Sequence, residues 1–289
     1  MAPSAAATPT LREKLDLLPA LGSLVFTTLS ALLTGWRRGP NDEPSLYLHV
    51  VYAAVRKLIV RLSSPQQQWV FPSTDAVYKQ QAASFKLAPH IVELRHGAKG
   101  LWIGDPDAGA VLVWYHGNLV AAVLAHLAHR HPEIDALPLP GPLAAAVMMA
   151  PWTALDGGTT NARLAGYNGA DILDRRALEY WAGKYMGDRA PDYYTDASSA
   201  PAEWFRGLPV GRILVLAGGN EILLPSIDAF VKTLEAGYGP VEFYVAEREA
   251  HIAPFVNLNF HSSAPTGQGD KLQSWLDEVV ASRGETAHL

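Results

Sequence analysis

The sequence predicts an α/β protein with three layers, in which a mostly parallel β-sheet lies between helices on both faces. Two observations support this prediction. From residue 110 onward, short apolar segments of strand length alternate with longer segments of helical periodicity. The strand-length segments are apolar almost throughout, which is typical of strands that are covered on both faces, as in a parallel sheet.

Composition limits the size of the fold and the kinds of partner. With 289 residues, of which 49% are hydrophobic and 18% charged, the chain can form one large core with a small appended segment. The net charge of -5 and the scattered lysines and arginines provide no basic surface, so we expect no nucleic-acid partner. The chain has no cysteine, which excludes thiol catalysis, disulfides and cysteine-bound metal. We predict neither a metal nor a cofactor, because His126, His129 and His131 look like the exposed end of a helix.

The N-terminal segment is long and apolar. Residues 17–36 carry no charge and are followed by Arg37 and Arg38, which is the length and flank of a membrane span. Pro19, several glycines and several hydroxyl side chains dilute this apolarity. We therefore favour a helix packed over the mouth of a site, and we expect a cytoplasmic location. Membrane contact through residues 17–36 is the alternative.

The other predicted elements follow in order along the chain. A second N-terminal helix is expected at residues 46–62, ended by Pro65, and an antiparallel hairpin at residues 91–94 and 101–103. The expected strands are then 110–115, 144–149, 212–217 and 241–246, and the expected helices are 119–129, 173–185, 226–236 and 271–280. Because two helices cannot enclose a core, we assign residues 1–70 to an appended helical cap and residues 71–289 to the α/β domain.

Polar residues and glycines follow these predicted strands. His116 and Gly117 come after the first strand, Glu221 comes after the third and His251 after the fourth. Ligands of open parallel sheets bind at the carboxyl ends of the strands. An acid after one strand and a histidine after the next is also the chain order of a serine–acid–histidine triad. These positions therefore predict a candidate site at one edge of the sheet.

On these residues, the sequence resembles the esterase and lipase branch of the α/β-hydrolase superfamily, which includes hormone-sensitive-lipase-like enzymes (α/β hydrolase fold-3). The similarity is greatest to fungal members that are often found in secondary-metabolite pathways, and it covers roughly residues 46–282. The resemblance implies an α/β-hydrolase-like fold and hydrolysis of carboxylic esters of small hydrophobic or secondary-metabolite substrates.

The same resemblance implies roles for individual residues. His251, in Glu-Ala-His-Ile-Ala-Pro-Phe, matches the general base, and Glu221 matches the acid that fixes the histidine tautomer, where most relatives have Asp. His116, Gly117 and Asn118 match the oxyanion hole, whose backbone N–H groups stabilise a developing negative charge. The structural alternative is that Glu221 caps the helix near residue 226 and that His251 is an ordinary loop residue.

The sequence departs from the family between Gly117 and Asn118. Relatives continue from His-Gly through further glycines, a helix and a central strand bearing Gly-Asp-Ser-Ala-Gly before they reach Gly-Asn-Leu. This chain passes directly from His116-Gly117 to Asn118-Leu119, and none of its serines has glycine two residues away on both sides. Ser226 is a weak substitute because we expect it at a helix N-cap. We predict an α/β-hydrolase-like fold truncated by loss of this nucleophile-elbow segment.

Three interpretations follow from the missing serine. The chain is an esterase or lipase impaired as written, or a non-catalytic protein of hydrolase fold that binds a ligand or partner, or the product of an incomplete gene model of an active esterase. If the segment is truly absent, residues 110–115 could take the place of the elbow strand. The aromatic residues of 167–194 are expected to pack in the core rather than to line an acyl pocket.

Overall fold

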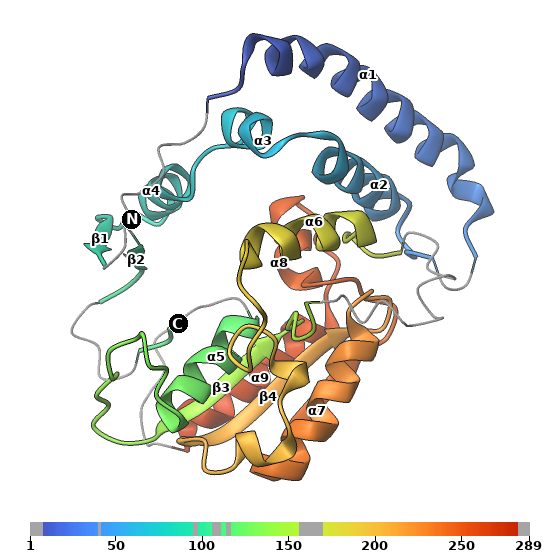
Figure 1. Ribbon diagram of the computed structural model, residues 1–289. Coiled ribbons are helices and arrows are strands. Elements are labelled where there is room, and N and C mark those ends of the chain that lie inside the picture. The colour runs from blue at the N-terminus through green and yellow to red at the C-terminus, as the bar shows by residue number, and fades with distance from the viewer. Residues whose placement is uncertain are drawn as a thin grey trace. The chain divides into compact units, whose positions relative to one another are not determined.

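The computed structural model describes residues 8–39, 42–94, 98–105, 111–113, 117–155 and 170–282. The chain divides into two compact units, of which the first consists of Met1–Phe26 and Arg61–Val113 and the second of Thr27–Val60 and Trp114–Leu289. Figure 1 labels the elements of both units. The division of the chain at residue 70 stays a prediction.

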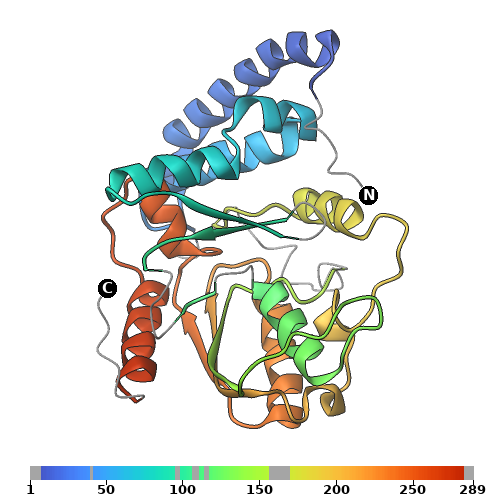
Figure 2. The same cartoon turned by 90° about the vertical axis from the view of Figure 1, so that its left-hand side faces the viewer.

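The first unit holds short helices and a β-hairpin. Its elements are the first part of α1 (Leu11–Thr34), α3 (Ser64–Val70), α4 (Thr74–Ser84), β1 (His90–Glu93) and β2 (Lys99–Trp102). The two strands pair antiparallel, which confirms the predicted hairpin (Figure 2). Tyr78 joins α4 to this hairpin, because its buried hydroxyl accepts a hydrogen bond from the His90 N–H (2.7 Å) and donates one to the Trp102 carbonyl (2.6 Å).

Polar contacts in this unit attach α1 to Arg61, the last residue of α2 (Leu46–Arg61), and to Ser63 just after it. Arg61 forms an ion pair of 2.6 Å with Asp16, and the Ser63 hydroxyl donates to Glu13 at 2.9 Å. Ser63 also caps α3 through a capping box with Gln66. The sequence pattern does not predict α3, because Pro65 marks the end of the preceding helix there. A proline is also tolerated in the first turn of a helix, which is where Pro65 lies in α3.

The helix α1 with its continuation, Leu11–Arg37, is long and apolar enough to cross a membrane by length and composition. Membrane contact through residues 17–36 stays a prediction.

The second unit contains a parallel sheet with helices on both faces. Its strands are β3 (Leu143–Met149), β4 (Val210–Gly218) and β5 (Glu242–Ala246), in the order β3-β4-β5 and all parallel. Its helices are α2 (Leu46–Arg61, as far as Val60), α5 (Gly117–Ala128), α6 (Arg175–Met186), α7 (Leu224–Tyr238), α8 (Ala253–Asn259) and α9 (Gly267–Ala281). These elements confirm the predicted α/β architecture.

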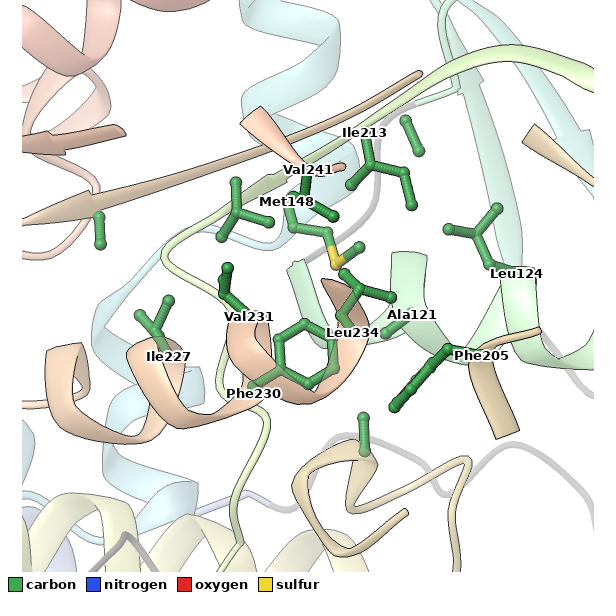
Figure 3. Packing of buried hydrophobic residues seen from close by; sticks show 14 of the residues in the cluster. Ala121, Leu124, Met148, Phe205, Ile213, Ile227, Phe230, Val231, Leu234 and Val241 are labelled. Atoms are coloured by element: carbon green, nitrogen blue, oxygen red, sulfur yellow. The ribbon is translucent and has the colours of Figure 1, made fainter. Parts of the chain in front are cut away.

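Alternate side chains of the central strand β4 enter two different core clusters. Ile213 and Val215 pack with buried residues of α5 and α7 on one face. The close view in Figure 3 shows Ile213 in this cluster. Leu214 and Leu216 lie on the opposite face with Trp275 of α9. Because both faces of β4 are covered, its sequence is apolar without alternation, as expected for a central parallel strand.

The register places three strand ends at one edge of the sheet. Met149 of β3 lies opposite Leu216 of β4, and Gly218 of β4 lies opposite Ala246 of β5. The residues that follow these three ends therefore lie at the carboxyl edge, where parallel sheets hold their ligands.

The strand predicted at residues 110–115 is wrong for its described part. Residues 111–113 form no strand, and their three apolar side chains are exposed. An apolar run becomes a strand only where another strand supplies hydrogen-bond partners, and the sheet of described residues offers none to this segment. The proposed substitution of this segment for the elbow strand therefore has no support from residues 111–113.

The histidines of residues 126–131 and the nearby aromatic side chains pack on one another. His129 stacks on Trp204 with ring centroids 4.1 Å apart, and its Nε2 lies 2.7 Å from the Trp204 carbonyl oxygen. Tyr193 and Tyr194 pack edge-on against the same Trp204 ring. These contacts account for the side chains by packing, and the described residues contain no group of three or more His, Asp or Glu that could hold a metal ion.

Candidate active site

The acid and the histidine that the sequence predicts lie next to each other. Glu221 follows β4 and His251 follows β5, and Oε1 of Glu221 lies 2.6 Å from Nδ1 of His251. The side chain of Glu221 is 0% exposed and that of His251 is 18% exposed. A carboxylate at Nδ1 is an acceptor, so Nδ1 carries the proton and Nε2 is left to exchange protons with a substrate or nucleophile.

Glu221 is held from its other oxygen by the backbone. Its Oε2 accepts a hydrogen bond of 3.0 Å from the Gly218 N–H at the end of β4. The alternative interpretation of Glu221 as a helix cap is wrong, since the N-cap of α7 is Leu223. Ser226 is not the N-cap either: it lies inside the first turn, and its hydroxyl donates to the Leu223 carbonyl at 2.8 Å.

The close approach of the two loops depends on Gly218. A Cβ atom at Gly218 would lie 2.3 Å from the Glu249 carbonyl oxygen and 2.6 Å from that of Ala250. Any larger residue would push the end of β4 away from the loop that carries His251. Ile252, directly after the histidine, has a left-handed backbone with φ of 45° and begins α8. A β-branched residue is strained in that conformation, which is typical of functional sites.

A second buried carboxylate, Asp171, joins the same site, and the sequence analysis did not identify it. Its Oδ1 accepts hydrogen bonds from the backbone N–H groups of His251 (2.9 Å) and Ile172 (2.7 Å). Its Oδ2 accepts one from the Ile222 N–H at 2.8 Å, and the residue is 1% exposed. No motif surrounds Asp171 in the sequence, so only the folded backbone could reveal it.

Burial and neighbouring charges change the pKa values of Asp171 and His251. Burial raises the pKa of Asp171 to about 6, with a further increase from Glu221, although the charge of His251 and the donated N–H bonds oppose it. Burial alone would lower the pKa of His251, but the charge and hydrogen bond of Glu221 and the charge of Asp171 raise it above its ordinary value. The site therefore favours a protonated imidazole and makes His251 a stronger base than an isolated histidine.

The described residues of the predicted oxyanion hole begin α5. Gly117 and Asn118 are its first two residues, whose N–H groups have no partner within the helix. A Cβ atom at Gly117 would lie 2.8 Å from Cα of Pro151 and 2.9 Å from the Met149 carbonyl oxygen, so α5 begins against the end of β3. His116 lies outside the described residues. The oxyanion role of His116, Gly117 and Asn118 stays a prediction.

Nε2 of His251 has no nucleophile beside it among the described residues. Its Nδ1 atom is bonded to Glu221, but no described serine, threonine or tyrosine hydroxyl forms a hydrogen bond with Nε2. In the part of the chain that the structure describes, the site thus has an acid and a base in contact without an attacking hydroxyl.

Comparison with known proteins finds a matching family model. Residues 116–254 match the model of the alpha/beta hydrolase fold family. No curated protein matches the chain significantly. The matched segment contains the start of α5, the three strands and both Glu221 and His251.

The chain is also similar to solved structures of esterases and lipases. An esterase from the bacterial hormone-sensitive lipase family is 26% identical, with 52% of this chain and 44% of that chain covered and a TM-score of 0.40. An esterase/lipase from an uncultured bacterium is 24% identical, with 57% and 50% covered and a TM-score of 0.43. A hormone-sensitive lipase from a metagenome library is 18% identical, with 57% and 50% covered and a TM-score of 0.42. This chain spans about half the length of these solved relatives. Residues 116–254 are thus similar to the alpha/beta hydrolase fold family.

Proposed function

We propose that the chain carries the acid–base half of a carboxylic ester hydrolase for small hydrophobic or secondary-metabolite esters, and that as written it is impaired in ester hydrolysis. The observation that supports this proposal is the 2.6 Å hydrogen bond between Glu221 and Nδ1 of His251, with Nε2 left without a described hydroxyl. A base that is oriented by a buried acid is what acyl transfer requires.

In such a reaction His251 removes the proton of the attacking hydroxyl at Nε2 and returns it to the leaving alcohol. Glu221 keeps the imidazole in the required tautomer and stabilises the imidazolium that forms. The N–H groups at the start of α5 would stabilise the negative charge on the carbonyl oxygen. Among the described residues no hydroxyl bonds to Nε2, so the covalent step has no nucleophile within this part of the chain.

Two other interpretations concern the direct passage from Gly117 to Asn118. If the gene model is incomplete, the full transcript encodes a segment with the serine, and the natural product is an ordinary esterase. Sequencing the transcript across the codons for Gly117 and Asn118 decides this question. If the passage is genuine, the alternative to an impaired esterase is a non-catalytic hydrolase-fold protein that binds an apolar ligand or a partner.

The proposed impairment is tested with short acyl esters. We expect the purified chain to hydrolyse p-nitrophenyl acetate and butyrate no faster than a His251→Ala variant, because no described hydroxyl bonds to Nε2 of the base. A His90→Ala variant, which changes an exposed histidine of the first unit, is the matched control. Turnover that is lost in His251→Ala and kept in His90→Ala would contradict the proposal.

A further inference from the structure

Asp171 is a second buried carboxylate of the site. The acid and base roles are taken by Glu221 and His251, so Asp171 has no role in the pair itself. It lies just before α6, is 1% exposed, and uses both carboxylate oxygens. A buried carboxylate costs folding free energy unless its hydrogen bonds and nearby charges compensate for lost hydration. Its position beside two catalytic-type residues therefore needs an explanation beyond packing.

The hydrogen bonds of Asp171 connect the two loops that carry the pair. Oδ1 accepts from the N–H of His251 itself at 2.9 Å, in the loop after β5. Oδ2 accepts from the N–H of Ile222 at 2.8 Å, the residue that follows Glu221 in the loop after β4. One carboxylate thus fixes the backbone of the histidine and the backbone next to the acid.

We propose that Asp171 is a positioning residue of this site, whose carboxylate holds the Glu221 loop and the His251 loop together so that the acid and the imidazole meet. In its bearing on catalysis, this proposal rests on the function proposed above. Both N–H groups are donors in buried surroundings and would be left without an acceptor if the carboxylate were removed, which costs about 1–3 kcal/mol for an unsatisfied buried group.

The charge of Asp171 acts on the imidazole as well. Its negative charge adds to that of Glu221 in raising the pKa of His251. From α2, Arg56 donates to the Asp171 carbonyl oxygen. Burial raises the pKa of Tyr52 on the same helix, and the charges of Glu43 and Asp171 raise it further. Asp171 therefore interacts with the positive charge of Arg56 and with the negative charge of Glu221.

The test is the titration of the His251 imidazole by NMR in an Asp171→Asn variant. Asparagine keeps the shape and can still accept from the His251 N–H, but it carries no charge and presents a donor toward the Ile222 N–H. We expect the pKa of His251 to fall relative to the unmodified protein, because the charge of Asp171 contributes to raising it. An Asp174→Asn variant changes a partly exposed carboxylate three residues away that caps α6, and it should leave the pKa of His251 unchanged.

An unchanged His251 pKa in folded Asp171→Asn protein would overturn the proposal. If that variant does not fold, amide hydrogen exchange in the unmodified protein replaces it. The N–H groups of His251 and Ile222 should then exchange as slowly as those inside β4, and exchange at the rate of unprotected amides would equally overturn it. Neither readout requires turnover, so a finding of esterase activity removes the proposed function and leaves the role of Asp171 to be decided by these measurements.

Discussion

A Phe230→Ala variant is expected to lose about 3–5 kcal/mol of unfolding free energy, because it removes a buried aromatic ring from the centre of the larger core. Phe230 lies on α7 and is fully buried, with its ring edge-on to Phe205 at a centroid distance of 5.7 Å. Figure 3 shows it among side chains of α5, α7 and the sheet. The cavity left by alanine would face several elements at once, so that local rearrangement could not fill it.

Urea unfolding followed by far-ultraviolet circular dichroism measures this loss. A Leu258→Ala variant is the matched control, since Leu258 on α8 is 74% exposed and its truncation should change the free energy by less than about 0.5 kcal/mol. Equal midpoint shifts for the two variants would contradict the position of the core described above.

A Glu221→Ala variant is expected to destabilise the protein more in acid than in alkali. At about pH 5 the buried His251 imidazolium would lose its counter-charge, and breaking a buried pair costs roughly 3–5 kcal/mol. At about pH 9 the imidazole is neutral, and the loss is that of hydrogen bonds to buried groups, about 1–3 kcal/mol. The Gly218 N–H loses its acceptor at both pH values.

The direction of this pH dependence follows from the pKa of His251, which the folded protein raises above its ordinary value of 6.5. A group whose pKa is raised on folding binds protons more tightly in the folded state. Its contribution to stability is therefore complete below the unfolded pKa and is lost as the pH rises through the folded pKa. Urea unfolding at the two pH values, with exposed Glu203→Ala as control, checks the prediction. A larger loss at about pH 9 than at about pH 5 would show that the pair does not hold a proton in this way.

Periodicity predicted most elements of the second unit. The helix expected at residues 119–129 is α5, and the strand expected at residues 212–217 is the inner part of β4. Both elements are long enough for their apolar pattern to be clear, and that pattern matches the faces that they bury. The short helix α8 was missed because seven residues give too little periodicity, and because its start is set by the left-handed Ile252.

Residues 111–113 show where pattern alone fails. Their valines and leucine favour a strand locally, but a strand needs a neighbour, and apolar composition does not specify one. The missing information is the pairing partner, which depends on the rest of the chain.

The site could be predicted only in part. Glu221 and His251 follow strand ends in the order that a hydrolase acid and base have, so chain position identified them. Asp171 follows no strand and belongs to no motif. Its importance comes from accepting N–H groups of residues 51 and 80 positions away in sequence, which only the folded chain brings to it.

The proposal that the chain has no activated serine is tested most directly by incubating the purified chain with a fluorophosphonate probe and measuring its intact mass. Because no serine of the sequence has the Gly-x-Ser-x-Gly setting and no described hydroxyl bonds to Nε2 of His251, we predict an unchanged mass. A stoichiometric adduct that maps to one hydroxyl and is lost in His251→Ala would show that the chain as written is a working serine hydrolase, in contradiction to the proposed impairment.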